Sequence, residues 1–275
     1  MTRARLGRMA YINTLPVDWE LAKGRFSELV SVHRGTPTIL NRLMAEGKLD
    51  VSPVSSVAAA EHADDWLVFD HLCIGCRGDV GSVVLHSDVP VEQLNGRCIA
   101  VTAASATAAK LLQVLLARHW KVQARLVSEN GKTLPRLLIG DPALKVSQSE
   151  PEGFLYDLGR SWQDYTGLDF VFGLWCVRRA FAEEHPQETW VLYHLLRTSR
   201  SSGRTEAAGV IAEAAGLTGL SEAKIKSYFD KLVYDLDAGL WNGLEHFLRL
   251  LGYEECPLQR FGGAEHWEAP ARRIG

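Results

Sequence analysis

Hydrophobic positions in the first third of the chain form short runs, separated by polar segments and by one amphipathic stretch. We predict strands where the runs are continuous, at residues 6–12, 29–33, 49–54, 67–74 and 82–85. Between the second and third runs the pattern becomes helical: Thr36 suits an N-cap, Pro37 the first helical position, and Gly47 the end. Alternation of strands and helices predicts an α/β fold with a largely parallel sheet.

The middle of the chain repeats this alternation, and the last part changes character. Further strands are predicted at residues 97–101, 122–127, 136–139, 154–158 and 170–172. From Gln187 onward, apolar residues recur three or four positions apart, which is typical of helices. We therefore predict two α/β lobes, lobe I from residues 1–86 and 176–275 and lobe II from residues 87–175, with a ligand cleft between them.

Composition and charge narrow the classes of function. The 275 residues are 47% hydrophobic and carry a formal net charge of −3, so the chain can form full cores but lacks the charge excess typical of nucleic-acid or membrane-surface binding. The densest basic group, Arg197, Arg200 and Arg204, is interpreted as a solvated helix end. No apolar run approaches the ~18 residues of a spanning helix. The residues after Met1 lack the apolar stretch of a secretory signal, so we expect a cytoplasmic protein.

Motifs for metal, redox or phosphate chemistry are incomplete. The five cysteines are odd in number and lie mostly in apolar runs, which is typical of reduced, buried thiols. Cys73 and Cys76 have the C-x-x-C spacing, but no second pair follows. The Gly-Lys-Thr at residues 131–133 resembles the end of a phosphate loop, yet Leu126 stands where the first glycine is required. We expect no metal and no cofactor.

Small polar residues follow several predicted strands, where helices begin. Ser55 and Ser56 follow one strand, Ser105 and Thr107 another, and Asp141 a third. Free backbone N–H groups and the positive dipole end make helix starts good sites for carboxylates. Ordinary capping uses the same residues and remains an alternative at each start. A carboxylate at position 141 repels an anionic ligand, so we expect Asp141 to hold a hydroxyl or a backbone group.

Several segments within residues 1–180 resemble, in the same order, those of chorismate dehydratases from the futalosine route to menaquinone. The matching segments are residues 11–16 (Tyr-Ile-Asn-Thr-Leu-Pro), 54–56, 82–87, 105–107, 139–143, 157–159, 162, 166–168 and 170–172. One departure is the run Val-Ala-Ala-Ala at residues 57–60, because members of this family often place an aromatic residue there. The helical tail adds little to the resemblance.

The resemblance implies a two-lobed type II periplasmic-binding-protein-like fold that is used as an enzyme without a cofactor. The implied reaction removes water from chorismate and gives 3-[(1-carboxyvinyl)oxy]benzoate. By motif position, Asn13 and Ser82 are the implied catalytic residues. The implied substrate-binding residues are Ser55, Ser56, Ser105, Ala106, Thr107 and Asp141.

Three other functions fit a fold of this kind. One is the sister enzyme that makes 1,4-dihydroxy-6-naphthoate, although its Ser-Pro-Cys-Pro-Asn-Asp segment is absent here. Another is a non-catalytic protein that binds a small carboxylate for transport, and the third is a ligand-sensing regulatory module. Fold alone does not separate these functions, because function depends on the site. The sequence does not indicate an oligomeric state.

Overall fold

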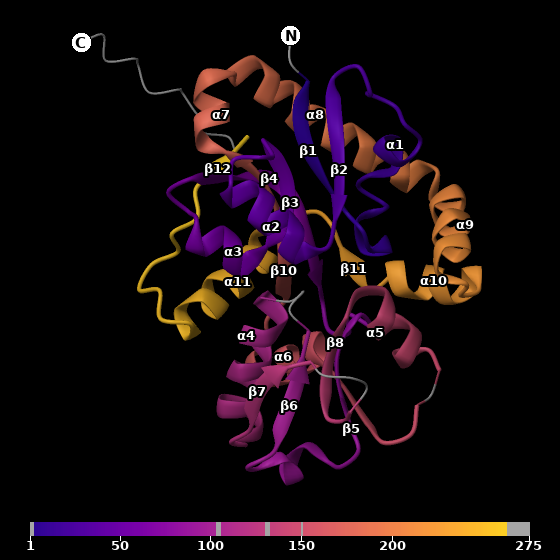
Figure 1. Cartoon of the computed structure of the whole chain (residues 1–275), viewed down its shortest axis with the longest axis vertical. Helices are drawn as coiled ribbons and strands as arrows, with labels where there is room; N and C mark the ends of the chain where they lie inside the picture. Colours follow the sequence, from indigo (N-terminus) through magenta and orange to yellow (C-terminus); the bar gives the residue numbers. More distant parts are fainter. Residues whose placement is uncertain (1–2, 103–105, 130–132, 150, 263–275) are drawn as a thin grey trace.

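The computed structural model describes residues 3–102, 106–129, 133–149 and 151–262. These residues form two sheets, one in each of two lobes that lie end to end along the long axis of the molecule (Figure 1). The first sheet has the order β11-β4-β10-β3-β1-β2, with β12 beside β4, and the second has the order β7-β6-β8-β5-β9. The predicted α/β class is confirmed.

The first sheet is mixed rather than largely parallel. Its strands are β1 (Ala4–Met9), β2 (Val30–Gly35), β3 (Val51–Ser55), β4 (Trp66–Cys76), β10 (Phe170–Arg178), β11 (Leu232–Val233) and β12 (Arg260–Phe261). Strand β1 pairs in parallel with β2 and β3, whereas β10 runs antiparallel to β3 and β4. The direction reverses because β10 enters this sheet from the opposite end, on its return from the second lobe.

The second sheet is mixed for the same reason. Its strands are β5 (Val83–Ser87), β6 (Cys98–Val101), β7 (Arg125–Ser128), β8 (Arg136–Ile139) and β9 (Phe154–Asp157). Strand β6 is parallel to β7 and β8, and β5 is antiparallel to β8 and β9. The chain therefore changes sheets between Cys76 and Val83 and again between Asp157 and Phe170. Both crossings come earlier than the expected boundaries at 86/87 and 175/176, because hydrogen-bonding partners are not visible in a local hydrophobic pattern.

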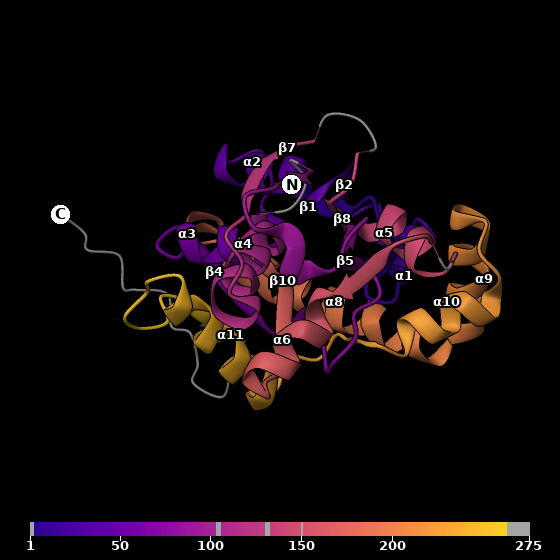
Figure 2. The same ribbon diagram turned by 90° about the horizontal axis from the view of Figure 1, so that it is seen from below.

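Helices flank both sheets. In the first half they are η1 (Ile12–Thr14), α1 (Trp19–Ala22), α2 (Pro37–Ala45), α3 (Ser56–Glu61), η2 (Val91–Leu94), α4 (Ala106–Val114) and the π-helix η3 (Leu115–Trp120). In the second half they are α5 (Gly140–Ser147), α6 (Leu158–Thr166), α7 (Arg179–Glu184), α8 (Pro186–Thr205), α9 (Ala207–Thr218), α10 (Glu222–Phe229) and α11 (Ala238–Leu250). Helices α7 to α11 accompany the first lobe, and α4 and α6 lie in the second (Figures 1 and 2). No helix in the described ranges is long and apolar enough to cross a membrane.

An aromatic cluster packs where the second crossing returns to the first sheet. Trp162 of α6 contacts Phe170 of β10 edge to face, with ring centroids 5.3 Å apart, and it contacts Phe247 of α11 at 5.9 Å. All three side chains are almost fully buried. Aromatic contacts of this kind add to the stabilisation from burial, so this cluster fixes one connection between the lobes.

Candidate active site

A cleft lies where the two sheets meet. It is open to solvent and holds about 70 Å³ of space, which is below the ~300–1,000 Å³ that is usual for small-molecule sites. Its lining residues are Met9, Pro37, Val54, Ser55, Ile74, Val83, Ala106, Thr107, Ala108, Ile139, Phe172 and Gly173. Strands β1, β3 and β8 end here, and the carboxyl ends of strands are where open α/β sheets bind ligands. Most of the wall is apolar, with the hydroxyls of Ser55 and Thr107 as polar groups.

The Ser55 hydroxyl is oriented by two donors. It caps α3 by accepting a hydrogen bond from the Ala58 N–H at 3.2 Å, and it accepts another from the Asn41 Nδ2 at 3.1 Å. The Asn41 Oδ1 in turn accepts from the Ser55 N–H at 3.2 Å. A serine hydroxyl has two acceptor positions and one proton. Because both acceptor positions are occupied, Ser55 can only donate to a ligand in the cleft.

Thr107 joins the two helix starts across the cleft. Its Oγ1 accepts a 3.1 Å hydrogen bond from the Val57 N–H in the first turn of α3, and the contact is buried. Thr107 therefore occupies a position that a carboxylate oxygen would otherwise take at this helix start. A ligand that binds the Val57 N–H has to displace Thr107, so ligand binding and the contact between lobes compete for this donor.

The other serines and the start of α4 contribute differently. The Ser56 hydroxyl donates to the Val171 carbonyl at 2.7 Å and ties α3 to β10, away from the cleft. Ala106 lines the cleft with its backbone and methyl group. Ser105 lies outside the described residues. Of the substrate-binding residues predicted from the sequence, the structure thus brings Ser55, Ala106 and Thr107 together in the cleft.

Asp141 connects the second lobe to the loop after β1. Its Oδ1 accepts a 3.1 Å hydrogen bond from the Ile12 N–H, which is one of the two uses expected for this carboxylate. The adjacent Gly140 has a φ of +61°, and a Cβ placed there would come within 2.7 Å of the Tyr11 ring. Burial and the Asp141 charge both raise the pKa of Tyr11, and burial raises the pKa of Asp141.

Asn13 follows this contact directly. It lies in η1, and its Oδ1 is buried without a hydrogen-bond partner among the described residues. An unpaired buried carbonyl oxygen is costly, by ~1–3 kcal/mol, and a bound donor would remove that cost. Asn13 is not among the residues that line the cleft as its walls stand in this structure.

Ser82 lies at the start of β5, on the first crossing. Its side chain is buried, and its Oγ accepts a 2.9 Å hydrogen bond from the Tyr228 hydroxyl of α10. Its carbonyl accepts from the Gly140 N–H at 2.8 Å. Through the adjacent Gly140 and Asp141, Ser82 is connected to Ile12, the residue before Asn13. Ser82, like Asn13, is not among the residues that line the cleft.

The Asp157 carboxylate holds the first crossing against the second. It accepts hydrogen bonds from the Val80 and Gly81 N–H groups, the shorter at 2.6 Å, and it also caps α6 through the Gly159 N–H at 2.9 Å. Burial raises the pKa of Asp157, and these backbone hydrogen bonds act in the opposite direction. One side chain therefore fixes both connections that lead from lobe to lobe.

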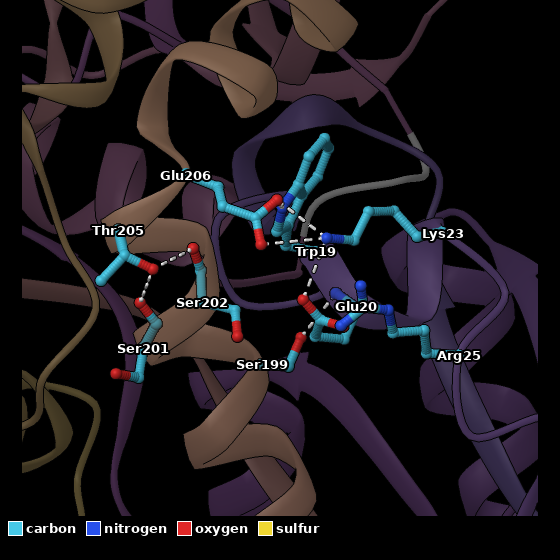
Figure 3. A network of polar contacts seen from close by, with 9 residues as sticks. All are labelled: Trp19, Glu20, Lys23, Arg25, Ser199, Ser201, Ser202, Thr205 and Glu206. Carbon is cyan, nitrogen blue, oxygen red and sulfur yellow. Dashed lines mark hydrogen bonds and ion pairs between the residues drawn. The ribbon is translucent and has the colours of Figure 1, made fainter.

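The segment that carries Asn13 is anchored to α8 by a polar network (Figure 3). The Glu20 carboxylate is 2% exposed and pairs with Lys23 at 3.1 Å and with Arg25 at 2.8 Å. The Trp19 indole N–H donates to the Glu206 carboxylate at 2.9 Å, and the same carboxylate pairs with Lys23. Glu20 is the buried member of these pairs, and a buried carboxylate is costly without its partners, so this network holds the loop between β1 and α1 in place.

The described residues do not offer a site for metal or thiol chemistry near the cleft. No group of three or more His, Cys, Asp or Glu side chains in the described part of the chain is arranged to hold a metal ion. Cys73 and Cys76 are free, buried thiols on β4, and burial raises the pKa of each. They belong to two different core clusters, as expected for side chains on opposite faces of a strand.

Comparison with known proteins gives the family. The profile of a family described as "Menaquinone biosynthesis" matches residues 4–253. The chain belongs to this family. Among its curated relatives is a chorismate dehydratase of Thermus thermophilus, 29% identical over 273 residues, with 92% of this chain and 97% of that protein covered.

Solved structures of similar proteins show the fold of the chain. Protein AF1704 of Archaeoglobus fulgidus has a TM-score of 0.72 at 17% identity, with 90% of this chain and 96% of that chain covered. The alkanesulfonate-binding protein SsuA of Xanthomonas axonopodis has a TM-score of 0.65 at 16% identity, with 95% and 99% covered. The fold is therefore periplasmic-binding-protein-like, as the resemblance implied.

Two residues of the site were missed by sequence reasoning. Asn41 orients Ser55 from α2, and Tyr228 binds Ser82 from α10. Asn41 is a polar residue beside the apolar face of a predicted helix, and that position could have indicated a polar contact in the site. The sequence around Tyr228 does not indicate its role, because its partner Ser82 is 146 residues away.

Proposed function

We propose that this chain is a hydro-lyase that dehydrates chorismate to 3-[(1-carboxyvinyl)oxy]benzoate. The observation that carries the proposal is the family match over residues 4–253, together with a cleft whose polar lining consists of hydroxyl groups. The named dehydratase relative covers nearly the whole chain. A largely apolar lining with two hydroxyl groups suits a ring that carries carboxylates.

The chemistry suits a site with few charged groups. The ring proton that is lost is vinylogous to a ring carboxylate, so donors on that carboxylate stabilise the negative charge that develops in the ring. Loss of the neighbouring hydroxyl then makes the ring aromatic. We propose that the enolpyruvyl carboxylate of the substrate accepts the proton. None of the described residues that line the cleft is acidic, basic or a histidine, so positioning supplies most of the rate.

Each polar group then has one task in this proposal. Ser55 donates to a substrate carboxylate, because its acceptor positions are already used. The Val57 N–H binds a carboxylate after Thr107 is displaced. The unpaired Asn13 Oδ1 accepts from a substrate hydroxyl when the lobes close, and Ser82 donates to the leaving hydroxyl.

The deciding experiment incubates the purified full chain with chorismate, without added metal or cofactor, and follows the products by mass spectrometry. Loss of one water to give an aromatic enolpyruvyl benzoate is expected. Asn13→Ala combined with Ser82→Ala is expected to abolish turnover while circular dichroism stays unchanged. Ser149→Ala, at an exposed hydroxyl on the end of α5, is the matched control.

Unchanged chorismate from protein that is shown to be folded would contradict the proposal. In that case the first assay is for the sister naphthoate-forming reaction, and the second is for binding of small carboxylates. Near-normal turnover by the Asn13→Ala, Ser82→Ala variant would leave the reaction in place but remove the roles assigned to these two residues.

A further inference from the structure

A second hollow lies in the first lobe, between α8, α9, α10 and β11. It holds about 190 Å³ of space, opens to solvent and shares no lining residue with the cleft. Its lining residues are Pro16, Arg200, Gly203, Arg204, Ala207, Val210, Ile211, Lys226, Phe229, Asp230, Leu232 and Tyr234. We call it the Arg204 pocket. The proposed reaction does not use any of these residues.

The Arg204 pocket has an apolar wall and a cationic rim. Val210, Ile211 and Phe229 supply the apolar wall, and Arg200, Arg204 and Lys226 supply the cations. Asp230 is the acidic residue in the lining, and it pairs with Lys226 at 2.6 Å. The rim is therefore locally positive in a chain whose formal net charge is −3. This combination suits a ligand with an anionic group on an apolar body.

The Tyr234 side chain is a second feature of the pocket, separate from its charge. It is 3% exposed, and its hydroxyl is buried without a hydrogen-bond partner among the described residues. The Nε of Arg200 is also buried and unpartnered, and the guanidinium of Arg200 lies 4.8 Å from the centroid of the Tyr234 ring. Buried donors left without partners are costly. The Tyr234 hydroxyl is closed to solvent, so an acceptor on a ligand satisfies it only after the pocket wall moves.

Arg204 is the cation that is available to a ligand. Arg200 pairs with Asp235 at 3.6 Å, whereas Arg204 forms no ion pair with the residues that the structure describes. Arg204 and Arg200 also border a smaller hollow on the next face of α8, together with Arg197. The three arginines therefore form one stripe along the last turns of α8, beside two hollows. Arg197 and Arg204 are exposed and Arg200 is half-buried, as expected for a solvated helix end.

We propose that the Arg204 pocket binds a small amphipathic carboxylate. The carboxylate lies between the Arg204 guanidinium and the Tyr234 hydroxyl, because a guanidinium presents paired donors that match a carboxylate. The apolar body packs against Val210 and Phe229. The pocket wall is close to the segment that carries Asn13. A Cβ on Gly203 would lie 2.1 Å from the carbonyl oxygen of Pro16, which is three residues after Asn13.

The test uses 1-naphthoate as the anionic probe and 1-naphthamide as its neutral counterpart, titrated into the full chain by calorimetry. Saturable binding of the carboxylate is expected, with binding of the amide weaker by about tenfold or more. Arg204→Gln and Tyr234→Phe are each expected to weaken naphthoate binding by about tenfold. Arg118→Gln, the same change at an exposed arginine of the second lobe, is the control and is expected to leave binding unchanged.

Two further measurements keep the result interpretable. Ser55→Ala alters the cleft and is expected to leave naphthoate binding to the Arg204 pocket intact. Tyr234→Phe removes a buried hydroxyl that has no partner, so its thermal midpoint is expected to match or exceed that of the wild type. Loss of binding in this variant then reports the contact with the ligand rather than unfolding.

Three outcomes would overturn the proposal. They are absence of naphthoate binding, equal binding of the amide, and loss of binding in Ser55→Ala with retention in Arg204→Gln, which assigns the probe to the cleft. None of these outcomes bears on chorismate turnover, so failure here is distinguishable from failure of the proposed function.

Discussion

The Tyr228 hydroxyl donates a 2.9 Å hydrogen bond to the Ser82 Oγ, and both side chains are buried. Because the Ser82 oxygen already accepts this bond, the Ser82 proton is left to donate elsewhere. A residue on a helix of the first lobe therefore sets the direction in which a residue on the first crossing can donate. We regard Tyr228 as a positioning residue for Ser82.

Tyr228→Phe is expected to lower kcat by about tenfold with a much smaller change in KM, since one hydrogen bond worth ~1 kcal/mol orients a group that acts in the transition state. Steady-state kinetics with chorismate measure this split. Combining Tyr228→Phe with Ser82→Ala tests the mechanism, because residues that act as a unit are not additive. Fully additive losses would show that Tyr228 acts independently of Ser82.

Asn41→Ala is expected to raise KM several-fold, because Ser55 loses the donor and the acceptor that fix its side chain and its N–H. The loss in unfolding free energy is expected to be about 1 kcal/mol. Asn95→Ala is the matched control, since Asn95 also accepts from a backbone N–H, that of Gln123, but in the second lobe. A similar rise in KM for both variants would contradict the role of Asn41.

Gly140→Ala and Gly96→Ala form a matched pair. Both glycines have positive φ, +61° and +74°, so both substitutions carry the same kind of backbone cost, ~1 kcal/mol. A Cβ at Gly96 meets nothing within 4 Å, whereas one at Gly140 meets the Tyr11 ring at 2.7 Å. We expect Gly140→Ala to lose clearly more stability and most of its activity. Equal losses of unfolding free energy in the two variants would show that the Tyr11 ring moves aside without destabilising the protein.

Asp18 predicts a pH dependence of stability. Burial raises its pKa to about 6, partly opposed by Thr14 and by Arg8, whose Nε lies 4.0 Å away. A raised pKa in the folded state stabilises the protein below the pKa of the unfolded chain, and this stabilisation is lost as the pH rises through 6. The unfolding free energy of the wild type should therefore fall between pH 4 and 7 relative to Asp18→Asn.

Urea unfolding at pH 4, 5, 6 and 7 measures this difference, which is expected to be on the order of 2 kcal/mol across the range. The exposed Asp64→Asn serves as the control. Parallel curves for Asp18→Asn and the wild type would contradict a raised pKa for Asp18 in the folded protein.

Local signals predicted most of the elements. Thr36, Pro37 and Gly47 correctly bracketed α2, and the apolar run at 67–74 became β4 at Trp66–Cys76. Signals of this kind act within a few residues, through capping and side-chain burial. Strand pairing depends on residues far apart in the sequence, and for that reason the crossings between sheets lie earlier than the lobe boundaries expected from the sequence.

The positions of the predicted site residues follow local signals in part, and their roles stay a prediction. Ser55 and Thr107 stand at helix starts, where sequence alone indicates exposed donors, and both line the cleft. The use of Ser56 as a clamp on β10 depends on Val171, 115 residues away. No local pattern distinguishes a hydroxyl that faces a ligand from one that faces a distant carbonyl group.

The order of strands has a consequence for how the chain is made. All five strands of the second sheet come from one continuous stretch, whereas the first sheet needs β10, β11 and β12 from the far side of that stretch. During synthesis the strands β1 to β4 therefore emerge before β10. The edges that later contact β10 stay uncovered until more than ninety residues have followed Cys76. Exposed strand edges invite wrong partners. The nascent first lobe is thus the part of this protein that most needs protection by chaperones.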